Sequence, residues 1–461
     1  MFVKTFTYGK IPIEIWEYPM LFLIMVLLFM VSGFIKRRNI HELPQYRFFL
    51  WGLWAKVLGG LVFGIIYVFY YSGGDTTSYY ECSLAFCNLF TDNFSNFVTA
   101  YMSGGTEEVK SIFTDETGSP LWYMFADSKT RMVIKILVPF MLLGMKSYFL
   151  TTVLVAVATY GGLWQLYMMF TRHFPQYATN LAVAVLFMPS IIFWGSGILK
   201  DSFTLATTCY FVVATNNLIT RRGSSFWNFV LLFISGFLIV SIKPYILIIL
   251  LPCTMVWMFY SKIKKIKNKF FRYVLVPFIY LFVIGGSYGI LTSMGSKLGK
   301  FAPERALQTA VTTQHDLKQD YYDGNSFDIG ELEATPLSII SKFPQATIAG
   351  LYRPFIWESN NIVMLLSGIE NLLILGLTLF VLISVKWRIL IQIIADHPLI
   401  LYCLFFSIMF AFMIGVTTSN FGALVRFKIP LIPLYMGSMV VLLGQLKVHA
   451  GVKRSHSLPT G

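Results

Sequence analysis

Charged residues are scarce in this chain. Asp, Glu, Lys and Arg make up 13% of its 461 residues, whereas an average soluble domain carries about 25%. Apolar and aromatic residues make up 56%, and they gather in uninterrupted runs close to the length that crosses a bilayer. The shortage of charge therefore excludes an ordinary soluble globule and predicts an integral membrane protein.

Cysteine is rare as well, and its spacing follows none of the patterns that ligate metal. Cys82 and Cys87 lie outside the expected membrane spans, so a disulfide between them stays open, but we expect two free thiols on one helix. The five cysteines are Cys82, Cys87, Cys209, Cys253 and Cys403.

Acidic residues are fewer than basic ones, 22 against 36, which gives a net charge of +14. In a soluble protein this balance would suggest a nucleic-acid partner. Here the basic residues stand just beyond the apolar runs, as the positive-inside rule expects of cytoplasmic loops. We therefore expect no nucleic-acid partner.

The apolar runs predict an all-α fold, a polytopic transmembrane helical bundle of about 11 spans with interfacial or re-entrant helices. The first run lacks a small-residue cleavage site and precedes Lys36-Arg37-Arg38, so we expect a transmembrane helix, not a cleaved signal peptide. The expected spans are residues 18–35, 48–71, 147–170, 178–194, 202–219, 225–242, 244–261, 271–293, 361–385, 397–416 and 429–446.

A further apolar stretch, residues 132–145, decides the orientation. It is short and contains Lys135 and Pro139. If it stays at the outer interface, the later basic clusters fall on the same side as Lys36-Arg37-Arg38, whereas a full crossing would turn them outward. The positive-inside rule therefore predicts an interfacial helix at 132–145, an external N-terminus and a cytoplasmic C-terminus.

This orientation leaves two outer segments that exceed ordinary connector length. In the second we expect an amphipathic helix over 303–317 and a further interfacial helix over 334–351. The expected parts are a single integral membrane domain over 1–461, outer loops at 72–131 and 294–360, and a cytoplasmic tail at 447–461.

Gly73-Gly74-Asp75 directly follows the second expected span, and Tyr79 comes four residues later. Asp75 thus lies where the chain leaves the membrane. A carboxylate there can take a proton from a hydroxyl nucleophile. Alternatively, the Gly-Asp pair forms a turn that caps the next helix, and the motif taken alone favours this reading.

A glycine-rich break separates two spans in the middle of the chain. It runs from Pro189-Ser190 to Trp194-Gly195-Ser196-Gly197, and Lys200 and Asp201 follow it. Irregular backbone at that depth is tolerated only against protein or a water-filled cavity. Ionisable groups at a membrane edge can simply snorkel, but a Lys-Asp pair beside such a break favours a lined cavity.

Further charges map to the same outer side. Lys243 occupies a very tight turn between two spans, Arg353 and Glu358 flank a Pro-Phe-Ile-Trp run, and Arg426 and Lys428 lie in the last outer loop. An arginine beside interfacial aromatics is well placed for a lipid phosphate. An aromatic-belt anchor explains the same run, so both interpretations stay open.

One carboxylate falls inside an expected span. Glu370 would be costly to bury alone in the bilayer, so we expect it to pair with a basic residue such as Lys56.

Together, the outer charges suggest a substrate that is both anionic and lipid-anchored, such as a polyprenyl phosphate or diphosphate sugar. Cations would hold the phosphate and offset charge on the leaving group, and a carboxylate would deprotonate the acceptor. The candidate site residues are Asp75 as the catalytic base, and Tyr79, Lys200, Asp201, Lys243, Arg353, Glu358 and Arg426 as substrate-binding residues.

Other chemistries lack their residues. Of the six histidines only His315 is external by this topology, which argues against a His-based metal site or acyltransferase. No P-loop or kinase-like glycine motif occurs, and no cytoplasmic loop is long enough for a nucleotide-sugar domain. We expect no cofactor, and the sequence leaves a divalent-metal requirement open.

Three motifs carry a resemblance that spans residues 48–430. Gly74-Asp75-x-x-x-Tyr79, the break from Pro189-Ser190 to Lys200-Asp201, and Arg353-Pro354-Phe355-x-Trp357-Glu358 resemble bacterial polytopic proteins of the glycosyltransferase C-like and exopolysaccharide or O-antigen polymerase kind.

For glycosyltransferase C enzymes, the resemblance implies an outer-loop acidic residue as the base, which would be Asp75 or Glu81. For polymerases it implies outer-loop arginines, which Arg353 and Arg426 match. The chain departs from the first pattern because it has no large C-terminal soluble domain and one acidic motif, not two. These departures leave the donor and the reaction open.

We therefore expect a membrane glycosyltransferase or polysaccharide polymerase at the outer leaflet of a bacterial cytoplasmic membrane. Its partners would be membrane lipid, a polyprenyl-linked sugar or oligosaccharide, and envelope glycan-assembly proteins. The alternative is a flippase or transporter of an anionic lipid or glycan, which should carry charge near the midplane at discontinuous helices. A structural subunit of an envelope complex is a third reading.

Overall fold

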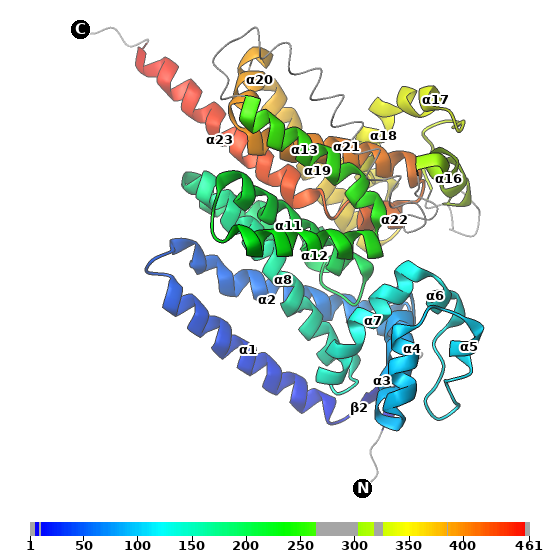
Figure 1. The fold of residues 1–461 in the computed structure, drawn as a ribbon. Coiled ribbons are helices and arrows are strands. Elements are labelled where there is room, and N and C mark those ends of the chain that lie inside the picture. The colour runs from blue at the N-terminus through cyan, green and yellow to red at the C-terminus, as the bar shows by residue number, and fades with distance from the viewer. Residues whose placement is uncertain (1–4, 9–10, 264–302, 318–325, 385, 457–461) are drawn as a thin grey trace. The chain divides into compact units, whose positions relative to one another are not determined.

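The computed structural model of the protein describes residues 5–8, 11–263, 303–317, 326–384 and 386–456. These residues are helical apart from loops and one antiparallel hairpin, in which β1 (Thr5–Tyr8) pairs with β2 (Ile11–Glu14) (Figure 1). The all-α fold is thereby confirmed.

The chain divides into two compact units. The first unit comprises Met1–Met168, Ile191–Tyr210 and Phe237–Lys243, and the second comprises Met169–Ser190, Phe211–Gly236 and Pro244–Gly461. Four of the described helices contribute residues to both units: α8 (Tyr148–His173), α10 (Pro189–Trp194), α11 (Lys200–Thr220) and α12 (Ser225–Ile242).

Two long apolar helices begin the first unit, α1 (Glu17–Asn39) and α2 (Phe49–Ile65), joined through a 3-10 turn at Pro44–Phe48. The last turn of α1 holds three basic residues, which complement the negative end of the helix dipole. A methyl group on Gly60 would lie 2.8 Å from the Ser196 carbonyl oxygen, and one on Gly64 would lie 3.0 Å from the Tyr148 ring. These glycines therefore allow close packing of α2 against its neighbours.

The expected outer loop at 72–131 is a helical layer, and its buried residues share one core with residues of β2 and α8. In Figure 1 it is drawn in cyan tones after α2, and α3 packs against both α4 and α7. Phe86, Phe125 and Leu137 are fully buried at its centre, and Cys82 and Cys87 are free thiols on one helix, as expected. The layer consists of α3 (Asp75–Asp92), α4 (Phe94–Met102), α5 (Glu107–Lys110), α6 (Trp122–Ala126) and α7 (Ser128–Leu143).

The short apolar stretch at 132–145 belongs to α7. This helix has 16 residues and contains Pro139. One of its faces, with Val133, Ile134 and Leu137, is buried in the same core as α3. Alpha-helices of this length fall short of the roughly 20 residues that a span needs.

The second unit is built around a tight pair of helices, α18 (Phe343–Tyr352) and α21 (Pro398–Thr417). A methyl group on Gly350 would overlap the Ala411 carbonyl oxygen, and one on Gly415 would overlap that of Ala346. Small residues on both helices thus let the two backbones approach each other closely.

The remaining helices of the second unit complete its bundle (Figure 1). They are α9 (Ala178–Leu186), α13 (Pro244–Ile263), α16 (Pro303–Leu317), α17 (Pro336–Ser341), α19 (Ile362–Ile383), α20 (Trp387–Asp396), α22 (Phe421–Phe427) and α23 (Ile432–His456).

The helix expected over 303–317 is confirmed as α16. The single helix expected over 334–351 is wrong, because the structure has two helices there, α17 and α18. Proline causes the break: Pro344 lies in the first turn of α18, where it has no N–H to continue a preceding helix.

Among the described residues, six helices are long and apolar enough to cross a membrane, or seven if a bent pair counts as one span. The bent pair joins α22 to α23 at an angle of 67°. The six are Glu17–Asn39, Pro44–Tyr70, Tyr148–His173, Ser225–Ile242, Ile362–Ile383 and Pro398–Thr417.

Five of the expected spans are not among the six, and one of these, 429–446, belongs to the bent pair. The continuous helix over 178–194 is wrong, because α9 ends at Leu186 and α10 (Pro189–Trp194) starts after a break. Residues 244–261 form a shorter apolar helix, and 202–219 form α11, which is not among the six. The span expected over 271–293 lies outside the described residues.

Candidate functional site

The chain leaves α2 through an unusual turn. A π-helical segment at Ile66–Tyr70 follows α2, and then Ser72, Gly73 and Gly74 all have positive φ, at 52°, 156° and 138°. Left-handed and extended positive-φ conformations are favourable for glycine, so the Gly73-Gly74 pair lets the chain reverse before α3.

Asp75 is the first residue of α3, and its side chain is exposed. Gly74 is the N-cap, and its carbonyl oxygen accepts a hydrogen bond of 2.9 Å from Thr77 Oγ1. Thr76 fixes the same turn through a 2.8 Å hydrogen bond with the Tyr148 hydroxyl. The carboxylate therefore has a defined place at the positive end of a helix dipole. Its role as a catalytic base stays a prediction.

Lys243 and Asp201 form a buried ion pair. Lys243 Nζ lies 2.5 Å from Asp201 Oδ1, and the two side chains are 7% and 1% exposed. Lys243 occupies the tight turn expected from the sequence, since α12 ends at Ile242 and α13 begins at Pro244. Each buried charge compensates the other, which a low-dielectric interior requires.

Lys200 has different partners from its neighbour Asp201. It donates a 2.7 Å hydrogen bond to Thr130 Oγ1, and its Nζ lies 3.6 Å from Asp127 Oδ2. Lys200 also interacts electrostatically with Lys243 and Asp75. Lys200, Lys243, Asp75, Asp127 and Asp201 therefore form one group of charges, which we call the lysine–aspartate cluster.

Asp127 was missed by the sequence reasoning. It caps α7 by accepting hydrogen bonds from the N–H and Oγ1 of Thr130, at 2.9 and 2.5 Å. Partial burial raises the pKa of this carboxyl, but the Thr130 hydrogen bonds and the Lys200 charge outweigh it and hold the pKa below its usual range. An Asp three residues before a Thr, just ahead of an apolar run, is an N-cap signal that would have marked this position.

Tyr79 is 4% exposed and belongs to the hydrophobic core of the α3–α7 layer. Its side chain packs inside this core. A contact between Tyr79 and substrate stays a prediction.

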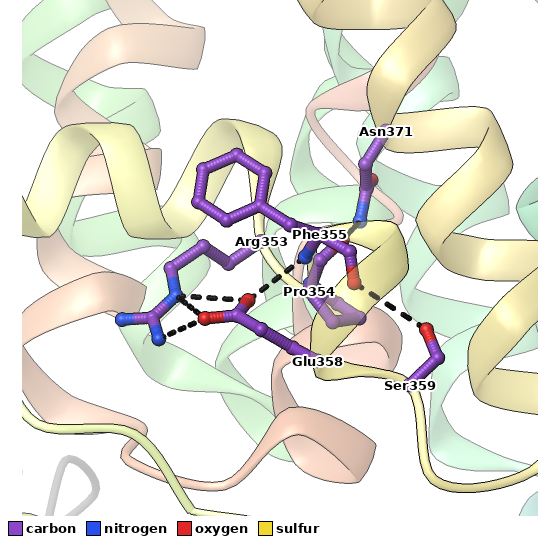
Figure 2. A network of polar contacts seen from close by, with 6 residues as sticks. All are labelled: Arg353, Pro354, Phe355, Glu358, Ser359 and Asn371. Carbon is purple, nitrogen blue, oxygen red and sulfur yellow. Dashed lines mark hydrogen bonds and ion pairs between the residues drawn. The ribbon is translucent and has the colours of Figure 1, made fainter.

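The second unit contains a separate arginine site, formed by Arg353, Glu358, Phe327 and Phe421. Figure 2 shows the guanidinium and the Glu358 carboxylate facing each other. Arg353 Nε donates to both carboxylate oxygens at 3.0 and 3.1 Å, and Nη2 donates to Oε1. The guanidinium carbon lies 4.7 Å from the Phe327 ring centroid and 5.2 Å from that of Phe421, within cation–π range.

Glu358 also accepts a 2.8 Å hydrogen bond from the Phe355 N–H (Figure 2). The side chains of Arg353 and Glu358 are 20% and 16% exposed. Among the described residues Arg353 Nη1 donates no hydrogen bond, so one edge of the guanidinium is left for an anion.

Lys428 supports the backbone of the arginine site through hydrogen bonds. It is 2% exposed and donates to the Arg353 carbonyl oxygen at 3.1 Å and to Asn371 Oδ1. Asn371 in turn donates to the Pro354 carbonyl oxygen at 2.9 Å (Figure 2). Lys428 therefore positions the backbone of the site. Arg426 lies in the last turn of α22, two residues before it.

Glu370 is buried in α19, where it accepts hydrogen bonds from the N–H and hydroxyl of Ser190 at 2.7 and 2.6 Å. The cation that acts on it electrostatically is Lys428. Lys56, the partner suggested by the sequence, donates to the Gly195 carbonyl oxygen. The expected pairing with Lys56 is therefore wrong: the hydrogen-bond partner of Glu370 among the described residues is Ser190, because sequence alone gives no helix rotation.

The predicted residues therefore fall into two sets. The first unit holds Asp75, Tyr79, Lys200, Asp201 and Lys243, and the second unit holds Arg353, Glu358 and Arg426. Within the described ranges, no three His, Cys, Asp or Glu side chains are grouped closely enough to hold a metal ion.

No protein-family model, curated protein or solved structure matches this chain.

Proposed function

We propose that the protein is a membrane glycosyltransferase or polysaccharide polymerase that acts on a polyprenyl-phosphate-linked sugar. The observation that supports this proposal is the lysine–aspartate cluster, which gathers two cations and three carboxylates beside the exit of an apolar helix. Such a group suits a substrate with a phosphate at the membrane surface and a hydroxyl to be activated.

Within the cluster the two lysines have different roles. Asp201 neutralises Lys243 inside the protein, whereas Lys200 is 22% exposed and its carboxylate partner Asp127 is 46% exposed. Lys200 is thus the cation that a phosphate can reach, and it would stabilise charge on the leaving group. Asp75, exposed and in electrostatic contact with Lys200, would accept the proton of the acceptor hydroxyl.

The arginine site of the second unit would by itself bind an anionic lipid headgroup. Trp357 is 77% exposed and stacks on Phe355, with ring centroids 4.8 Å apart. Aromatic side chains of this kind gather at membrane interfaces, and the free edge of Arg353 would bind a phosphate beside them.

The topology that goes with this function is a bacterial cytoplasmic membrane protein of about 11 spans with the N-terminus outside. This orientation depends on residues 132–145 not crossing the membrane, and the short length of α7 supports that interpretation.

The proposal is tested by Asp75→Asn in cells that lack the wild-type gene and carry the variant. Transfer of labelled sugar from polyprenyl lipid to glycan should fall by roughly 10²- to 10⁴-fold, the usual value of general-base catalysis. Asp115→Asn, an exposed change in the same layer, should retain wild-type transfer. Wild-type transfer by a correctly folded Asp75→Asn protein would overturn the assignment of the base.

A specific observation also favours the transporter alternative. Glu370 binds Ser190 at the break between α9 and α10, and Lys428 lies in the break between α22 and α23. Charges at discontinuous helices are typical of transporters. Movement of a fluorescent polyprenyl phosphate across proteoliposomes, with its mass unchanged and with loss of flux in Glu370→Gln, would favour this function over transfer.

A further inference from the structure

A pocket of about 170 Å³ opens in the second unit, apart from both charged sites. Its lining mixes imidazole, amide and hydroxyl groups with an apolar wall. The lining residues are His173, Phe174, Asn216, Ile219, Thr220, Trp257, His397, Pro398 and Leu399.

Hydrogen-bond donors in this pocket lack protein partners. Asn216 is only 3% exposed, and its Oδ1 is bonded to His173 Nε2 at 3.0 Å. Within the part of the chain that the structure describes, Asn216 Nδ2 donates no hydrogen bond. Because Asn216 lines the pocket, its amide group is left to donate to a molecule bound there.

The start of α21 adds a second donor. His397 is the N-cap but makes no side-chain capping bond, and Pro398 has no N–H. The Leu399 N–H donates no hydrogen bond to the described residues either. It lines the pocket at the positive end of a 20-residue helix, where anions are favoured.

The charges around the pocket are positive. Arg172 and Arg222 both act electrostatically on the His173 ring. Asp396, next to His397 in the chain, does not line the pocket. The donors and the surrounding charge thus select an anion.

Two other ligand classes fit less well. A metal ion would find two imidazoles but no carboxylate or thiolate in the lining, fewer than the ligands a stable site needs. A sugar would need a free aromatic face, and the Trp257 ring already stacks on Tyr402 at 4.5 Å.

We propose that this pocket binds a phosphate group, either as free phosphate or as the headgroup of an anionic lipid. The Asn216 amide and the Leu399 N–H at a helix N-terminus, with two nearby arginines, match the acceptor oxygens and charge of that group. Phe174, Ile219 and Trp257 supply an apolar wall beside it.

Two variants of the full chain in detergent test this site. Asn216→Asp is nearly isosteric and puts a negative charge where the phosphate would lie, and Thr220→Asp does so from an exposed position. Both should weaken binding at least tenfold. Asn180→Asp, an exposed asparagine at the start of α9, adds the same charge outside the pocket and should bind within twofold of wild type.

Binding is measured for two probes, inorganic phosphate by phosphorus NMR and dioleoyl phosphatidylglycerol by native mass spectrometry. Binding of inorganic phosphate identifies a free-phosphate site, and binding of the lipid alone identifies a headgroup site. The proposal is overturned if wild type binds neither probe, or if Thr220→Asp and a folded Asn216→Asp bind both as wild type does.

Discussion

The lysine–aspartate cluster and the arginine site draw their charges from the chain in different ways. In the cluster, Lys243 is 42 residues from Asp201 and Lys200 is 70 residues from Thr130. In the arginine site, Arg353 and Glu358 are five residues apart, on either side of one turn. The first is an assembly of distant segments, and the second is largely a local structure supported by Lys428.

The two sites also differ in which charged groups stay accessible to solvent or a ligand. The arginine site satisfies most of its own guanidinium through Glu358, Phe327 and Phe421. The cluster buries one ion pair and leaves Lys200 and Asp75 within reach of solvent. The stability of the arginine site is explained by its local pairing, whereas long-range gathering of charges with an accessible remainder in the cluster favours function.

The largest expected effect comes from breaking the buried pair of the cluster. Lys243→Met removes the ion-pair partner of the buried Asp201 carboxylate, which should lower the free energy of unfolding by about 3–5 kcal/mol. Chemical unfolding of the detergent-solubilised chain measures the change. The double variant Lys243→Met/Asp201→Leu removes both charges and should recover most of the loss. If Lys243→Met unfolds with the same free energy as wild type, the ion pair does not contribute to the stability of the fold.

A smaller effect is expected at the arginine site. Glu358→Gln removes the carboxylate charge from a partly buried guanidinium and weakens three hydrogen bonds, which should cost about 1–3 kcal/mol. Glu331→Gln, an exposed change in the same unit, is the matched control and should be neutral. If Glu358→Gln matches this control in the same unfolding assay, the pair is no more than a surface contact.

The smallest effect depends on pH. Because the pKa of Asp127 is lowered on folding, its contribution to stability is present above the unfolded pKa of about 3.9 and is lost as pH falls through the lower folded value. Thermal unfolding of wild type and Asp127→Asn should differ at pH 6 and converge near pH 3. If the unfolding temperatures of the two proteins differ by the same amount from pH 6 to pH 3, the ionised Asp127 carboxylate does not contribute to stability.

Much of the fold followed from the sequence, because apolar runs and proline positions act locally. The helix over 303–317 and the tight turn at Lys243 were predicted correctly on this basis. The helical layer between α2 and α8 was predicted as a loop. Most of its helices are short, and hydrophobic periodicity within one segment does not show which other segments it packs against.

The candidate site was predicted only in part. Lys200, Asp201 and Lys243 were chosen because charge is costly at a membrane edge, and the structure brings them together. Their pairing was not predictable, since adjacent Lys200 and Asp201 point to different partners along α11. Phe327 was missed because its role depends on a contact with Arg353, which is distant in sequence. Asp127 carries a local N-cap signal, but its pairing with Lys200 joins segments far apart in the chain.

The most direct test of the central claim is sugar transfer by Lys200→Gln. Glutamine keeps a donor for Thr130 but removes the charge that would hold the phosphate. The account predicts that transfer from polyprenyl lipid falls by roughly 10²- to 10³-fold in a protein that unfolds at the wild-type temperature. Transfer at the wild-type rate would contradict it.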